Sequence, residues 1–191
     1  MKIPPSVIAF DIDGVVADTM RLFLSIAASE FGIESARYED IVDYDLRNCM
    51  NIDDDVLMAI ILKIMGGDFS MPLNPMADAP RVLNVLNKHH CPTLFVTARP
   101  EKTHITGWLC EKIDLPASSI EVVATGSFEG KRKVLEDHNI RYFVEDRLET
   151  CFVLAEAGIK PIVFRQPWNR KPHPFAEVND WREIETLVML S

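Results

Sequence analysis

The chain has 191 residues, of which 48% are hydrophobic and 26% are charged, and its formal net charge is −9 at pH 7. This length and composition are typical of one globular domain, or of one core with a small insertion, and argue against a disordered chain. The negative charge argues against a nucleic-acid polymer as partner, because proteins that bind such polymers present a basic face.

Neither the cysteines nor the first residues predict a zinc site, a signal peptide or a membrane anchor. Only a few apolar residues precede Asp11, too few for a secretory signal or a membrane span. The cysteines are far apart and form no CxxC or Cys/His cluster. They are Cys49, Cys91, Cys110 and Cys151. We therefore expect reduced thiols, a cytoplasmic protein and no membrane partner.

The first predicted element is a short buried strand that runs from Val7 into Asp11. In an extended chain the side chains of residues i and i+2 share a face, so Asp11 and Asp13 repel each other unless a cation lies between them. A divalent metal ion is the simplest such cation. Gly14 tolerates a positive φ and is expected to let the chain turn sharply off the strand.

A helical insertion is predicted directly after this strand. About 80 residues separate the first strand from the second, whereas a complete βαβ unit takes about 30. Apolar helical patterns cover Val16–Phe31 and Asp53–Met65, with an acidic stretch between them. We expect residues 17–75 to form a helical cap, and residues 1–16 and 76–191 to form the core domain.

The rest of the chain alternates strand and helix, a pattern typical of a parallel sheet with helices on both faces. The predicted strands are Thr93–Thr97, Ile120–Ala124, Arg141–Glu145 and Pro161–Arg165, and the predicted helices are Ala77–Lys88, Lys102–Cys110, Lys131–His138, Leu148–Ala157 and Asp180–Leu190. The predicted fold is therefore α/β: a three-layer α/β/α, Rossmann-like parallel sheet with a small helical cap inserted after the first strand.

Polar residues follow three of these strands, at the edge where α/β sheets bind ligands. Asp11 and Asp13 follow the first, Thr97-Ala98-Arg99 the second, and Glu145-Asp146-Arg147 the fourth, while Lys131 begins the helix that leads into the fourth. These residue types suit phosphoryl transfer through an aspartyl-phosphate.

Each side chain has a role in that reaction. Asp11 is the expected nucleophile, and Asp13 is the expected acid and base, which protonates the leaving group and later deprotonates water. Mg2+ is expected as cofactor, held by Asp11, the backbone carbonyl of Asp13, and Asp146. Thr97 and Lys131 are expected to bind phosphate oxygens.

The order of these motifs resembles the haloacid dehalogenase-like phosphatases, from residue 6 to about residue 165. In that family the insertion after the first strand is a small helical cap, and the resemblance implies the same roles for Asp11, Asp13, Thr97, Lys131 and Asp146. Four shorter tracts resemble the 5'(3')-deoxyribonucleotidases and their bacterial relatives. They are Phe95–Pro100, Glu145–Arg147, Gln166–Arg170 and Asp180-Trp181.

Two assignments stay open at this point, because a small shift in alignment exchanges neighbouring residues. Glu145 competes with Asp146 as the metal ligand. Lys133 competes with Lys131 as the phosphate ligand, although Lys131 follows Gly130 at the start of the helix.

The predicted function is Mg2+-dependent hydrolysis of a phosphomonoester, with a nucleoside monophosphate as the favoured substrate. Ala98, next to Thr97, and Tyr44, in the acidic stretch of the cap, are further candidates for substrate binding. The alternatives are a phosphatase for a sugar phosphate or other small metabolite, and a phospho-acceptor signalling module. In such modules the acceptor aspartate ends a later strand, which disfavours them. The expected partner is a small phosphorylated metabolite, and a second copy of the chain, as a homodimer, is the other candidate.

Overall fold

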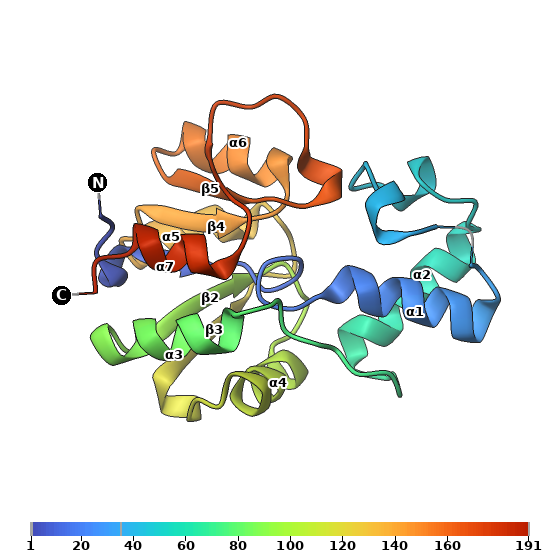
Figure 1. Ribbon diagram of the computed structural model, residues 1–191, viewed down its shortest axis with the longest axis horizontal. Helices are drawn as coiled ribbons and strands as arrows, with labels where there is room; N and C mark the ends of the chain where they lie inside the picture. The colour runs from blue at the N-terminus through green and yellow to red at the C-terminus, as the bar shows by residue number, and fades with distance from the viewer. Residues whose placement is uncertain (1, 35, 191) are drawn as a thin grey trace.

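A parallel sheet of six strands forms the centre of the molecule (Figure 1). The structure is a computed structural model that describes residues 2–34 and 36–190. The strand order is β3-β2-β1-β4-β5-β6, and every neighbouring pair is parallel. The strands are β1 (Ile8–Phe10), β2 (Thr93–Thr97), β3 (Ile120–Ala124), β4 (Tyr142–Glu145), β5 (Lys160–Phe164) and β6 (Ala176–Val178). The predicted α/β class is confirmed, and β2 and β3 have the predicted bounds.

The sixth strand was not predicted from the sequence. It has three residues, lies at the edge of the sheet beside β5, and exposes Ala176 and Glu177. So short a strand with only Val178 buried has no alternating apolar pattern by which it could be recognised.

Helices cover both faces of the sheet, as the predicted three-layer arrangement requires. Phe10 and Phe95 belong to the apolar layer beneath α3, α4 and α7, whereas Ala9 and Val96 pack with α5 and α6 on the opposite face. This alternation follows from the two-residue period of a strand. The core helices are α3 (Ala79–His89), α4 (Thr103–Ile113), α5 (Gly130–Asp137), α6 (Leu148–Glu156) and α7 (Trp181–Leu187).

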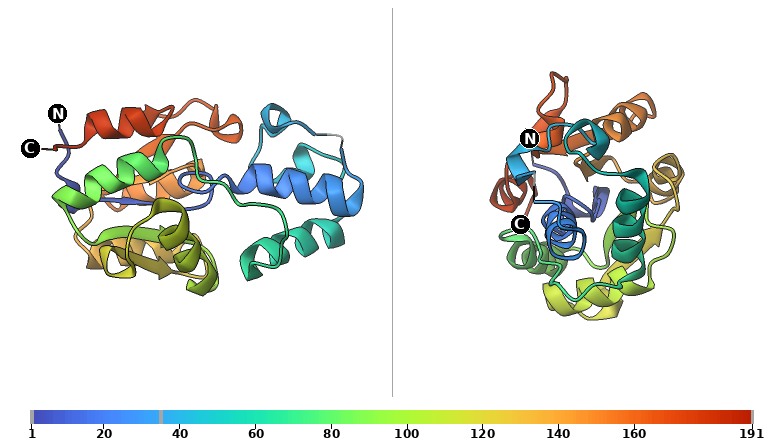
Figure 2. Two further views of the ribbon diagram at one scale, coloured as in Figure 1. Left: turned by 60° about the horizontal axis from the view of Figure 1, so that its bottom comes forward. Right: turned by 90° about the vertical axis from the view of Figure 1, so that its right-hand side faces the viewer.

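The segment between β1 and α3 lies to one side of the sheet layers (Figures 1 and 2). It contains α1 (Thr19–Phe31) and α2 (Asp54–Gly66), which pack side by side, and two short turns of 3-10 helix between them. The two connections to the core pair with each other, because Asp18 N donates to Asn74 O (2.9 Å) and Met76 N donates to Val16 O (2.7 Å). This pairing lies at the bounds expected for the helical cap.

The first helix starts later than its apolar pattern suggested. Residues 12–17 form a turn instead of a first helical turn, and α1 begins at Thr19 with the Asp18 carboxylate accepting a hydrogen bond from Arg21 N (3.3 Å). Among the helices of the described residues, none combines the length and apolar character that a membrane span needs.

Candidate active site

A cavity of about 850 Å³ lies between the carboxyl ends of the strands and the helical cap. Residues from both sides line it: Asp11, Thr97 and Asp146 belong to the core, and Phe23 and Leu57 to α1 and α2. The predicted clustering of polar strand ends is therefore found, on the cap side of the sheet.

The turn after β1 brings Asp11 into this cavity. Asp11 N still donates to Val144 O of β4 (2.9 Å), which holds the backbone at the end of the sheet before the chain turns. Gly14 then adopts a φ of +78°, as its position in the motif predicted. A Cβ at Gly14 would also collide with the carboxylate of Asp146. Glycine is needed here for its conformation and for its small size.

Lys131 connects two carboxylates in the buried part of the site. Its Nζ lies 2.9 Å from Asp11 Oδ1 and 2.8 Å from Glu145 Oε2, and its side chain is fully buried. Lys133, the alternative considered from the sequence, pairs with Asp137 on the surface, where its side chain is 80% exposed. Of the two lysines, Lys131 is the one that lies beside Asp11.

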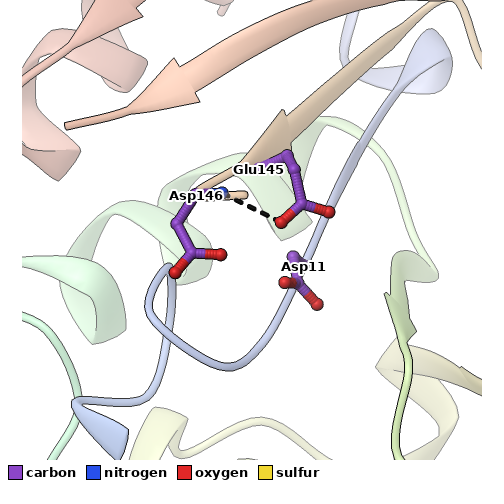
Figure 3. Close-up of side chains that lie close together, drawn as sticks. All are labelled: Asp11, Glu145 and Asp146. Carbon is purple, nitrogen blue, oxygen red and sulfur yellow. Dashed lines mark hydrogen bonds between the residues drawn. The ribbon is translucent and has the colours of Figure 1, made fainter. Parts of the chain in front are cut away.

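The carboxylates of Asp11, Glu145 and Asp146 lie close together (Figure 3), and Lys131 contacts the first two. Burial, then the negative charge of Glu145, raise the pKa of Asp11 well above its usual range. Burial and the charges of Glu145 and Asp11 raise the pKa of Asp146 in the same way. Burial opposes ionisation of Glu145 too, but Lys131 and local hydrogen bonds hold its pKa below the usual value. The negative charge of the three carboxylates therefore exceeds the positive charge of Lys131.

The donor set fits a hard divalent cation. Oxygens of Asp11, Glu145 and Asp146 lie within 4.8 Å of one another, and carboxylate oxygens are the ligands that Mg2+ prefers. Glu145 already uses both its oxygens: one faces the lysine, and the other accepts hydrogen bonds from the amides of Asp146 and Arg147 (3.0 Å each). Asp11 and Asp146 are therefore the better placed ligands of the three.

The surroundings of Asp13 differ from those predicted from the sequence, in which one cation lies between the carboxylates of Asp11 and Asp13. Its carboxylate instead pairs with Arg99, whose Nη2 lies 2.7 Å from Oδ1 and whose Nε lies 2.9 Å from Oδ2. The Thr19 hydroxyl also donates to Oδ1 (2.6 Å). Burial would raise the pKa of Asp13, but Arg99 and Thr19 hold it below its usual value. Each aspartate thus has its own basic partner.

Thr97 and Ala98 lie at the end of β2, on the cavity wall. The Thr97 hydroxyl accepts a hydrogen bond from Arg99 N (3.2 Å) and donates to Asp13 Oδ2 at 3.5 Å. Thr97 therefore lies beside Asp13, and both residues line the same cavity as the two aspartates.

Tyr44, Phe128 and Arg147 form an aromatic and cationic cluster at the cavity wall. The rings of Tyr44 and Phe128 meet edge to face with centroids 5.9 Å apart. The Arg147 guanidinium carbon lies 4.0 Å from the Phe128 centroid and 5.1 Å from that of Tyr44. Sequence reasoning found Tyr44 but missed Phe128, which precedes Lys131 by one helical turn.

The segment Gln166–Asn169 supports the site from behind. Trp168 Nε1 donates to Asp146 Oδ2 (3.0 Å), and Asn169 Nδ2 donates to Asp146 O (2.8 Å). Gln166 Nε2 donates to Gly14 O (2.7 Å). These side chains fix the two loops that carry the carboxylates. From the sequence, this tract was singled out for its resemblance to deoxyribonucleotidases, with Trp168 expected either to line the site or to cover the sheet edge.

Comparison with known sequences agrees with this geometry. Residues 5–191 match the protein family described as "5' nucleotidase, deoxy (Pyrimidine), cytosolic type C protein". A curated relative is "Putative nucleotidase YqfW" of Bacillus subtilis (strain 168). The two sequences are 27% identical over 179 residues, which cover 92% of this chain and 90% of the relative.

Solved structures of haloacid dehalogenase-like hydrolases share the fold. The Streptococcus pneumoniae hydrolase of that family superimposes with a TM-score of 0.61 at 12% identity, over 95% of this chain and 98% of the other. A Had-superfamily hydrolase from Ehrlichia chaffeensis gives 0.56 at 15% identity, over 97% and 96%. At such identities the likeness concerns the fold, which it confirms.

Proposed function

The chain belongs to the family of cytosolic type C 5' nucleotidases and is a phosphatase of the nucleotidase type, and from this we propose that it hydrolyses nucleoside monophosphates through a phosphorylated Asp11. The observation that carries the proposed chemistry is the contact between Asp11 and the buried Lys131 at the carboxyl edge of the sheet. A carboxylate held at that edge by an ammonium group is placed to attack phosphorus.

In the first half-reaction, an oxygen of Asp11 forms a bond to phosphorus while the bond between phosphorus and the ester oxygen breaks. Asp13 must carry a proton for this step, and it gives that proton to the departing oxygen, so that an alcohol leaves and Asp13 becomes ionised. Lys131 and the Thr97 hydroxyl bind oxygens of the transferred group, with the amide of Ala98 beside them. The partial burial of the cavity beneath the cap excludes water during this step.

In the second half-reaction, Asp13 takes a proton from a water molecule whose oxygen attacks the phosphoaspartate. The bond between Asp11 and phosphorus breaks, inorganic phosphate leaves, and both aspartates return to their starting states. The ion pair with Arg99 favours the ionised form of Asp13 that this step requires.

Mg2+ fits the carboxylate cluster, and we assign Asp11, Asp146 and the backbone carbonyl of Asp13 as its ligands. When bound, it supplies positive charge that offsets the carboxylates and the phosphate. Glu145 then serves mainly as the partner of Lys131 and of two backbone amides.

The Tyr44–Phe128–Arg147 cluster supports a nucleotide over a sugar phosphate. Aromatic rings and a guanidinium group stack well on planar, π-rich groups, which a nucleobase has and a simple sugar lacks. The apolar residues of α2 that line the cavity, such as Leu57 and Ile61, favour the same choice.

A hydrolysis screen tests this function. Purified protein is assayed with Mg2+ on nucleoside monophosphates, deoxynucleoside monophosphates and sugar phosphates, with release of inorganic phosphate as the readout. We expect the highest kcat/KM on a nucleotide, loss of activity with EDTA, and recovery with added Mg2+. F128A should lower kcat/KM for the nucleotide and leave a sugar phosphate unaffected. Equal activity on both classes in wild type and F128A would count against a nucleotide substrate.

A further inference from the structure

Arg99 lies between the second aspartate and the helical cap, and the proposed reaction uses it only as the ion-pair partner of Asp13. Its side chain is 3% exposed. Nε and Nη2 contact the two oxygens of Asp13 at 2.9 and 2.7 Å, and Nη1 donates to the backbone carbonyl of Ile64 at 3.1 Å. One guanidinium group therefore joins the loop after β1 to α2.

The backbone at Arg99 is fixed from both sides. Its amide donates to the Thr97 hydroxyl (3.2 Å), and its carbonyl accepts a hydrogen bond from Gly126 N (3.0 Å). The side chain thus extends from a rigid point at the end of β2. Because this backbone is held in place, the position of the guanidinium group depends on its contacts with Asp13 and with Ile64 of α2.

The contact on the cap side is also well defined. Ile64 lies in the last turn of α2, which ends at Gly66, and its carbonyl belongs to the partially negative end of the helix. A guanidinium group interacts favourably with this end of the helix. The contact between Arg99 and Ile64 forms only when α2 packs against the core. Without Arg99, α2 has no charged link to the catalytic carboxylates among the contacts of the described residues.

We propose that Arg99 is a positioning residue, which orients the Asp13 carboxylate toward the cavity and makes that orientation depend on the seating of α2. This inference rests on the proposed function, in which Asp13 is the acid and base. The Asp13 side chain is 25% exposed and lies on a turn, and without Arg99 it would keep only the hydrogen bonds from the Thr19 hydroxyl (2.6 Å) and the Thr97 hydroxyl (3.5 Å) among the contacts of the described residues. Two parallel bonds from a planar guanidinium fix both the direction and the plane of the carboxylate.

The expected effect depends on the leaving group. An alkoxide such as that of a nucleoside needs a proton from Asp13 as it departs, whereas p-nitrophenolate leaves without one. In R99M we expect kcat/KM to fall about 10²-fold for a nucleoside monophosphate and by less than about tenfold for p-nitrophenyl phosphate. R99K, which retains the charge but not the two-point contact, should fall between R99M and wild type.

A double mutant separates positioning from direct contact with the phosphate. If Arg99 acts through Asp13, the variant D13N/R99M should be no slower than D13N on either ester. The control is R81M, because Arg81 makes a similar two-point contact with Glu185 (3.1 and 2.8 Å) on the core surface. R81M should leave both activities at wild-type values, and circular dichroism and thermal unfolding check that each variant is folded.

Three outcomes would overturn the proposal. Equal losses on the two esters in R99M would indicate a general structural role, and a further loss on adding R99M to D13N would indicate that Arg99 binds the phosphate. If R99M fails to fold, the same comparison is made with R99K, and equal losses on the two esters in R99K would also overturn the proposal. Failure of the proposed function is distinct, because wild-type protein would then not hydrolyse the nucleoside monophosphate.

Discussion

Replacing Lys131 with methionine tests how the carboxylate cluster is held together. Methionine has nearly the length of lysine, so K131M removes the charge and the donors without leaving a large cavity. The ammonium group lies 2.9 Å from Asp11 Oδ1 and 2.8 Å from Glu145 Oε2. Its removal leaves three buried carboxylates, with oxygens within 4.8 Å of one another, without their basic partner.

The size of the effect follows from this arrangement. Removing one partner of a buried ion pair costs about 3–5 kcal/mol, because the remaining charge stays buried and unpaired. For a chain of this size, that corresponds to a fall in Tm of roughly 6–20 °C. Mg2+ should recover part of the loss, and should raise the Tm of K131M by more than it raises that of the wild type.

Urea unfolding gives the loss in free energy of unfolding and thermal unfolding gives the fall in Tm. Both are followed by far-UV circular dichroism, in EDTA and again in Mg2+. K133M is the matched control, since Lys133 is exposed and pairs only with Asp137, and we expect no measurable change. A K131M protein that unfolds like the wild type in EDTA would refute the conclusion that Lys131 compensates the cluster.

Three further variants test other parts of the structure. D11N should lower kcat by at least about 10⁴-fold while the protein still folds, and substantial turnover by purified D11N would exclude Asp11 as nucleophile. W168F removes the hydrogen bond to Asp146 and should raise the Mg2+ concentration for half-maximal activity about 10- to 100-fold; an unchanged titration would contradict this. The hydrogen bond to Val134 O raises the pKa of His138 in the folded protein. The protonated His138 side chain therefore stabilises the fold fully below its unfolded-state pKa of about 6.5, and this stabilisation is lost as the pH rises through the pKa of His138 in the folded protein. H138Q should therefore lower Tm in acid and not at alkaline pH, and equal Tm losses at both would contradict the ionic origin.

Local patterns were sufficient for most of the fold. The run that became β2 is buried on both faces, β3 is apolar apart from the exposed Glu121, and both have turn residues at their ends, so their bounds could be predicted. Gly14 was predicted to turn the chain because it lacks a Cβ and tolerates a positive φ, and its φ is +78°. The length of the interval between β1 and β2 predicted the insertion, since no simple crossover is so long.

Contacts between distant residues could not be predicted in the same way. Arg99 meets Asp13 across 86 positions and Ile64 across 35, and nothing local distinguishes it from an arginine that caps the next helix. Trp168 reaches Asp146 only because the loop after β5 folds back over β4. Such partners become visible only once the sheet order is known.

The sequence raised the question of what keeps Asp11 and Asp13 from repelling each other, and the structure answers it differently from the prediction. Three of the four carboxylates of the site contact a basic side chain, Lys131 for Asp11 and Glu145, and Arg99 for Asp13. The fourth, Asp146, accepts a hydrogen bond from Trp168 instead. Four negative charges and two positive charges leave a net charge of −2, which one divalent cation cancels. Arg99 already balances the charge of Asp13. The uncompensated negative charge therefore lies on Asp11 and Asp146, whose pKa values are the ones raised. The two aspartates thus have separate basic partners, which agrees with the different roles proposed for them: Asp11 lies in the carboxylate cluster proposed to hold the metal ion, whereas Asp13 is ion-paired with Arg99.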